Sequence, residues 1–151
     1  MALYAANATG AAVPNSMATI LEVNPPANRQ AIISEVSISF SGVSATDVPV
    51  IVQLVEVTAA SAAGTAVTPA SMRDGQVAAG AAAKKLPASE GTVVVLKTYD
   101  VPPSSGLVIQ YPLGREPAIQ GAAASAKGFA IRANRGAGAA INAEANIEWD
   151  E

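Results

Sequence analysis

Residues 141–149 read Ile-Asn-Ala-Glu-Ala-Asn-Ile-Glu-Trp, and they alternate apolar and polar side chains without a break. Successive side chains of a β-strand point to opposite faces of the sheet, so this stretch predicts a strand with one buried and one solvated face. The same alternation appears in residues 36–40 and, over a shorter length, in residues 129–132. The pattern indicates a chain built on half-buried strands.

Other segments are apolar on both faces and rich in β-branched residues. Such runs are typical of central strands in a sandwich, or of strands that a partner covers. They are residues 19–23, 50–57, 92–99 and 107–111. We expect the last three of these segments to form the sandwich core.

Clusters of Gly, Pro, Asn and Ser separate these segments and predict turns. They lie at residues 24–28, 41–47, 102–106 and 134–138. Many short strands with this punctuation, and no long helical period, predict an all-β fold. We expect an antiparallel β-sandwich or jelly roll of about seven or eight strands. A chain of 151 residues fits a single domain over its whole length, residues 1–151.

Two segments do not fit the strand rhythm. Residues 1–17 are interpreted as an N-terminal arm, either frayed or ordered by a neighbour. Residues 59–91 are rich in Ala, Gly and Ser and are interpreted as one long loop insertion, a surface excursion in a monomer or a contact arm in an oligomer. Within that loop, residues 67–69 could form a short edge strand and residues 78–85 one turn of helix.

The composition argues against several classes of function. The sequence has no Cys and no His, which removes disulfides, thiol nucleophiles and the commonest general base and zinc ligands. The net charge is −3 with the Lys and Arg residues dispersed, so we expect neither a nucleic-acid partner nor binding to an anionic membrane. No stretch resembles a signal peptide or a membrane span, and we expect a soluble protein.

Few residues could carry chemistry. Glu144, Glu148 and Asp150 share one face of the last predicted strand, but same-face neighbours are about 6.5–7 Å apart, and a solvated face gives the same pattern. Lys84 or Lys85 with Ser89 has no recognised dyad spacing. We therefore expect no catalytic residue, no cofactor-binding residue and no metal site.

Three further features have structural explanations that we favour. Trp149 and Tyr111 could stack on a sugar, but a Trp at the inward position of an alternating strand belongs to a core. Residues 114–117 are interpreted as an exposed turn. The Gly-Ala-Gly run at residues 136–138 opens a strand and not a helix, so it does not predict a phosphate site.

Several segments together resemble small virion structural proteins of tailed phages that infect high-GC bacteria. They are residues 1–10, 42–50, 111–114 and the ending from Gly128 to Trp149. The chain is also similar in outline to small jelly-roll decoration, or cement, proteins that sit as trimers on capsids. The resemblance spans nearly the whole chain, but its motifs are turns and alternations of low specificity.

This resemblance implies a homotrimer that is made in the host cytoplasm and binds the phage major capsid protein on the outer surface of the head. The arm and the long loop would supply the contacts between subunits. Two alternatives remain open: a tail or fibre-associated β-sandwich module that recognises a host-surface ligand, and an unusual enzyme that relies on Glu144 or Glu148.

Overall fold

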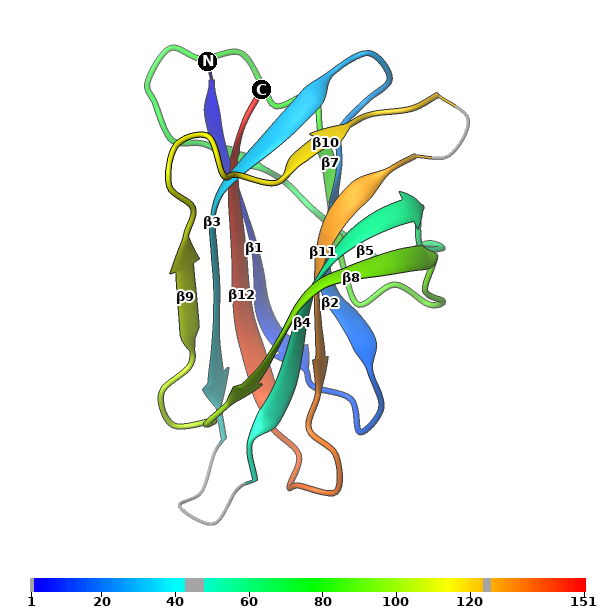
Figure 1. Ribbon diagram of the computed structural model, residues 1–151, viewed down its shortest axis with the longest axis vertical. Helices are drawn as coiled ribbons and strands as arrows, with labels where there is room; N and C mark the ends of the chain where they lie inside the picture. The colour runs from blue at the N-terminus through cyan, green and yellow to red at the C-terminus, as the bar shows by residue number, and fades with distance from the viewer. Residues whose placement is uncertain (1, 43–47, 124–125) are drawn as a thin grey trace.

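The computed structural model describes residues 2–42, 48–123 and 126–151, and it consists of two antiparallel β-sheets packed face to face (Figure 1). Each sheet has six strands. The first, sheet A, contains β1 (Leu3–Ala12), β3 (Gln30–Ser41), β6 (Ala70–Ser71), β9 (Leu107–Gln110), β10 (Ala118–Gln120) and β12 (Asn142–Asp150). The second, sheet B, contains β2 (Ala18–Asn24), β4 (Val50–Ala59), β5 (Thr65–Val67), β7 (Ala82–Lys85), β8 (Thr92–Val101) and β11 (Gly128–Asn134). The all-β sandwich predicted from the sequence is confirmed.

The strands of each sheet follow an order that is far from the order along the chain. Sheet A runs β10-β3-β12-β1-β6, with β9 also paired to β3, and sheet B runs β5-β7-β2-β11-β4-β8. The two ends of the chain are paired directly, since Leu3 lies opposite Asp150. Figure 1 shows both termini at the same end of the sandwich.

The core lies between the sheets, and the size of its side chains decreases along β1 and β12. Tyr4 and Trp149 are register partners at one end, with their ring centroids 6.0 Å apart. Towards the other end the buried partners become small, with Ala8 opposite Ala145. The alternation read in residues 141–149 is confirmed, because every second side chain of β12 is buried.

The N-terminal arm predicted for residues 1–17 is wrong over residues 3–12. Residues 3–12 form β1, which lies inside sheet A between β12 and β6. Tyr4, Ala6 and Ala8 point into the core and are at most 1% exposed. Backbone hydrogen bonds to both neighbouring strands and this burial hold the segment in place.

The long loop predicted for residues 59–91 is also wrong in part. The segment is inserted between the paired strands β4 and β8, but it contains the three short strands β5, β6 and β7. The suggested helical turn at residues 78–85 is absent; residues 82–85 are β7, which pairs with both β2 and β5. The strand suggested at residues 67–69 overlaps β5 only at Val67.

The described residues form twelve strands, where about seven or eight were expected. All seven segments named from the sequence are strands, and the additional ones are β1, β5, β6, β7 and β10. The turn expected at residues 41–47 falls largely on residues 43–47, which lie outside the described part of the chain.

The expectation that residues 92–99 and 107–111 belong to the core is wrong for much of their length. β4 is central in sheet B, but β8 is the last strand of that sheet and β9 lies along the edge of sheet A. A β-branched run reports strand propensity, and it does not distinguish a central strand from an edge strand.

Candidate functional site: the strap over sheet B and the free edge of β8

Two segments of the insertion cross the outer face of sheet B side by side, and we call residues 60–64 and 86–91 together the strap. Ala62 N donates to Ser89 O at 2.9 Å, and Ala88 N donates to Ala63 O at 2.9 Å. At Gly91 a Cβ atom would lie 1.8 Å from Ala59 O, so only glycine allows the approach. The strap covers a face of sheet B that would otherwise meet solvent.

Under the strap lies a glutamate with no exposed surface. Glu22, on β2, accepts a hydrogen bond from Ser61 Oγ at 2.5 Å and one from Ser61 N at 3.3 Å. Asn24 Nδ2 donates to Glu22 Oε1 at 2.9 Å, and Lys84 Nζ lies 3.5 Å from the same oxygen. Lys84 also donates to Ser61 O at 2.7 Å, so the buried charge is paired and hydrogen-bonded.

A second ion pair fixes the other part of the strap. Arg132, on β11, contacts Glu90 with two guanidinium nitrogens, and Thr19 Oγ1 donates to Glu90 Oε1 at 2.7 Å. Burial alone would raise the pKa of the Glu90 carboxyl, but the hydrogen bonds from Arg132 and Thr19, with the charge of Arg132, bring that pKa below its usual value. Two carboxylates thus hold the strap to sheet B: Glu22 of the sheet accepts from Ser61 of the strap, and Glu90 of the strap accepts from groups on the sheet.

The edge of sheet B opposite β5 exposes apolar side chains. Val94, Val95 and Leu96 are consecutive on β8 and are 50%, 46% and 40% exposed. Among the described residues β8 pairs only with β4, so the backbone groups on its other side have no strand partner. The register shift between Leu54 and Val55 leaves Leu96 as the bulged residue of β8, and Lys97 follows it along the edge.

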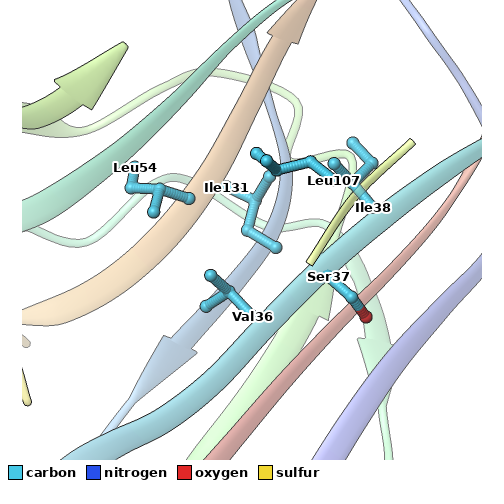
Figure 2. A pocket seen from close by; sticks show the side chains of 6 residues that line it. All are labelled: Val36, Ser37, Ile38, Leu54, Leu107 and Ile131. Carbon is cyan, nitrogen blue, oxygen red and sulfur yellow. The ribbon is translucent and has the colours of Figure 1, made fainter. Parts of the chain in front are cut away.

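A narrow apolar space opens between the sheets near this edge (Figure 2). It is too narrow to hold a water molecule, so it is no site for a small-molecule ligand. Its lining comes from β3, β9, β4 and β11: Val36, Ser37, Ile38, Leu107, Leu54 and Ile131.

The three carboxylates predicted to share a face of the last strand do so on the outer side of sheet A. Glu144 Oε1 accepts a hydrogen bond from Gly10 N at 2.8 Å. Glu148 lies opposite Glu35 on β3, and burial, followed by the charge of Glu35, raises the pKa of Glu148. Among the described residues no group of three or more acidic side chains is placed to hold a metal ion.

The lysines considered for a dyad with Ser89 have backbone partners instead. Lys84 donates to Ser61 O, as described above, and Lys85 Nζ donates to Thr9 O at 2.9 Å. Ser89 accepts a strap hydrogen bond through its own carbonyl. The structure therefore places these residues in the strap and its supports.

The residues considered for sugar stacking lie in the core or at its margin. Trp149 is fully buried, and its Nε1 donates to Glu151 Oε1 at 3.1 Å, so the interpretation of Trp149 as a core residue is confirmed. Tyr111 is half-buried; burial and the nearby Tyr99 raise its pKa to about 12.

The two glycine-containing segments form turns. Residues 112–115 are closed by a hydrogen bond from Arg115 N to Pro112 O at 3.0 Å, and Gly114 adopts a φ of 83° that favours glycine. Residues 134–138 span the end of β11 and the first part of its connection to β12, with Gly136 N donating to Asn134 Oδ1 at 2.7 Å.

Sequence reasoning missed the buried layer under the strap. Glu22 lies in an apolar run, where a charge signals either an outward face or a paired buried group, and its partner Ser61 is far along the chain. The only signal in the sequence was the presence of a charged residue, Glu22, within the apolar run at residues 19–23.

No protein-family model matches the chain, and no curated protein or solved structure is significantly similar to it. The described residues contain no helix long and apolar enough to cross a membrane.

Proposed function

We propose that this chain is a non-enzymatic virion structural protein, a jelly-roll capsid decoration protein that oligomerises as a trimer and binds the outer surface of a phage head. The observation that carries the proposal is the apolar free edge of β8. Its exposed valines and leucine sit beside backbone groups that have no strand partner in the described part of the chain, and such an edge either receives another chain or promotes aggregation.

The strand pairing supports the jelly-roll assignment. Four antiparallel pairs are nested in one another along the chain: β1 with β12, β2 with β11, β3 with β9 and β4 with β8. This nesting is what a long antiparallel ribbon produces when it rolls into two facing sheets. Jelly rolls occur in viral capsid and lectin domains, so the support is an analogy at the level of fold.

The burial of the aromatic residues favours a structural role over glycan recognition. All six aromatic side chains are buried or half-buried, whereas stacking on a sugar needs an exposed ring. A tail or fibre module that binds host glycan therefore has less support, and an enzyme built on Glu144 or Glu148 has none beyond the carboxylates themselves.

Light scattering over a dilution series tests the oligomer. We expect the mass of a trimer, and we expect Val94→Lys to lower it by placing a charge on the β8 edge. The control is Val108→Lys, a valine that is 65% exposed on β9 in the other sheet. A monomer at every concentration, or equal effects of the two variants, contradicts a β8 interface.

Co-sedimentation with purified phage heads tests the partner. A decoration protein pellets with heads and not with host cells, and Val94→Lys weakens the pelleting if oligomerisation supplies avidity. Binding to cells without binding to heads would favour the tail module instead.

A further inference from the structure

Lys84, Glu22 and Asn24 lie together on the outer face of two paired strands. Lys84 on β7 is the register partner of Glu22 on β2, and Asn24 follows two residues later, on the same face. A diagonal neighbour at this spacing is within reach of a long side chain. Register therefore brings an amine, a carboxylate and a primary amide to one place.

The contacts converge on a single oxygen. Glu22 Oε1 accepts from Asn24 Nδ2 at 2.9 Å and lies 3.5 Å from Lys84 Nζ. Because both nitrogens contact the same oxygen, the distance between Lys84 Nζ and Asn24 Nδ2 cannot exceed the sum of these two distances. The strap closes over the group, since Glu22 is fully buried and the Lys84 side chain is only 19% exposed.

The amide nitrogen of Asn24 is surrounded by acceptors. Besides Glu22 Oε1, it contacts Ala126 O at 3.1 Å and Lys127 O at 3.4 Å. These oxygens fix the orientation of the amide and leave its NH₂ group beside a carboxylate that can deliver a proton to it.

We propose that Lys84 and Asn24 join in an intramolecular amide cross-link, with Glu22 as the proton carrier. Glu22 Oε1 lies 3.5 Å from Lys84 Nζ, close enough for the carboxylate to take a proton from the amine as the reaction begins. The neutral amine then attacks Asn24 Cγ, forming the Nζ–Cγ bond. Glu22 returns the proton to the amide nitrogen as the Cγ–Nδ2 bond breaks, and the departing ammonia takes the surplus proton from Nζ and leaves as ammonium.

The reaction balances without a cofactor or an oxidant. One lysine ammonium and one primary amide give one secondary amide and one ammonium ion, and Glu22 ends as the carboxylate with which it began. The product ties β7, at the base of the strap, to β2 covalently. In a chain without Cys it provides a staple that disulfide chemistry cannot.

The intact mass of the purified wild-type protein tests the proposal directly. We expect a mass below that of the sequence by one molecule of ammonia, and a protease digest in which one branched peptide contains both Lys84 and Asn24. Wild-type protein that keeps the full sequence mass after prolonged incubation overturns the proposal, and so does an ammonia loss that maps to any other residue.

Three variants assign the roles. Lys84→Arg removes the nucleophile and Glu22→Gln removes the proton carrier with little change of shape, so both should show the full sequence mass. The matched control, Lys85→Arg, alters the adjacent lysine, which contacts Thr9 O, and should retain the ammonia loss. Ammonia loss that persists in Lys84→Arg would also overturn the proposal. The test is independent of the capsid function proposed above.

Discussion

At the scale of single residues, one buried and one partly buried carboxylate explain why the insertion is ordered. Glu22 accepts two hydrogen bonds from Ser61, and Glu90 accepts hydrogen bonds from the Arg132 guanidinium. A carboxylate taken out of water is tolerated only where partners replace its solvation. The contacts of each carboxylate therefore hold the strap against sheet B, and the strap shields these contacts from solvent.

The hydroxyl of Ser61 should be among the more important side chains of the insertion. Ser61→Ala leaves a buried carboxylate oxygen of Glu22 without its shortest partner, and we expect a loss of about 1–3 kcal/mol in the free energy of unfolding. Ser104→Ala, at an exposed turn, should change it by less than about 0.5 kcal/mol. Urea unfolding followed by Trp149 fluorescence measures both, and equal effects would contradict this account.

Glu148 and Glu90 should respond to pH in opposite directions. The raised pKa of Glu148 means that the folded state binds this proton more tightly than the unfolded state does. Its stabilising contribution is complete below the ordinary glutamate pKa and is lost as the pH rises through the raised value. Glu90 has a lowered pKa, so its contribution is present above the ordinary value and is lost as the pH falls through the lowered one.

The two glutamine variants test these signs. At pH 7 Glu148→Gln should be more stable than wild type, because it removes an ionised carboxylate that the fold disfavours. Glu90→Gln should be less stable, because it removes an ionised carboxylate that the fold favours. Both differences should shrink at about pH 3, where carboxyls are largely protonated. Differences that are the same at the two pH values would assign the effects to packing.

At the scale of strands, the clearest lesson comes from β1 and β8. The alternation of β12 could be predicted because Asn and Glu contrast with Ala, Ile and Trp. Along β1 the buried Ala6 and Ala8 are flanked by outward Ala5, so alanine occurs on both faces and the contrast disappears. For β8 the sequence predicted a strand, but only its place in the sheet order reveals an exposed edge.

The same physics limited prediction of the candidate site. The lone charge at Glu22 gave no indication of burial, because the groups that satisfy it arrive from Ser61 and Lys84 after the chain has crossed the sheet. Long-range hydrogen bonds of this kind leave no periodic signal in the sequence.

A charge placed on the inner face of β1 distinguishes a core strand from an arm. Ala8→Asp puts an unpaired carboxylate where the side chain is 0% exposed, and we expect a loss of more than about 3 kcal/mol or failure to fold. The neighbouring Thr9→Asp lies on an exposed position and should fold normally. The emission of the buried Trp149 should shift to the red only in the first variant, and an unchanged spectrum there would contradict the place of β1 in the core.

At the scale of the whole molecule, the nested pairing determines how the chain must fold. β1 finds its partner β12 at the opposite end of the sequence, and β2 finds β11. The long stretch of chain between the two strands of each pair must be brought together before their contacts can stabilise the fold. The entropy lost in this closure slows folding.

Refolding should therefore be slow for a chain of this size. We expect folding times on the order of milliseconds to seconds, as for other all-β sandwiches. Stopped-flow dilution from urea, monitored through Trp149, measures the rate. A microsecond phase that accounts for the whole change in signal would mean that local contacts dominate.

The antiparallel contact between the two ends of the chain also has a mechanical consequence. Ala2 and Glu151 exchange backbone hydrogen bonds in both directions, and the ladder between β1 and β12 begins there with Leu3 and Asp150. The hydrogen bonds of an antiparallel ladder run perpendicular to its strands. A force that separates the two termini would therefore load these bonds one at a time, as in a zipper. A load that entered through the broad faces of the sheets would not open this ladder from its end, so the protein would stay intact for longer.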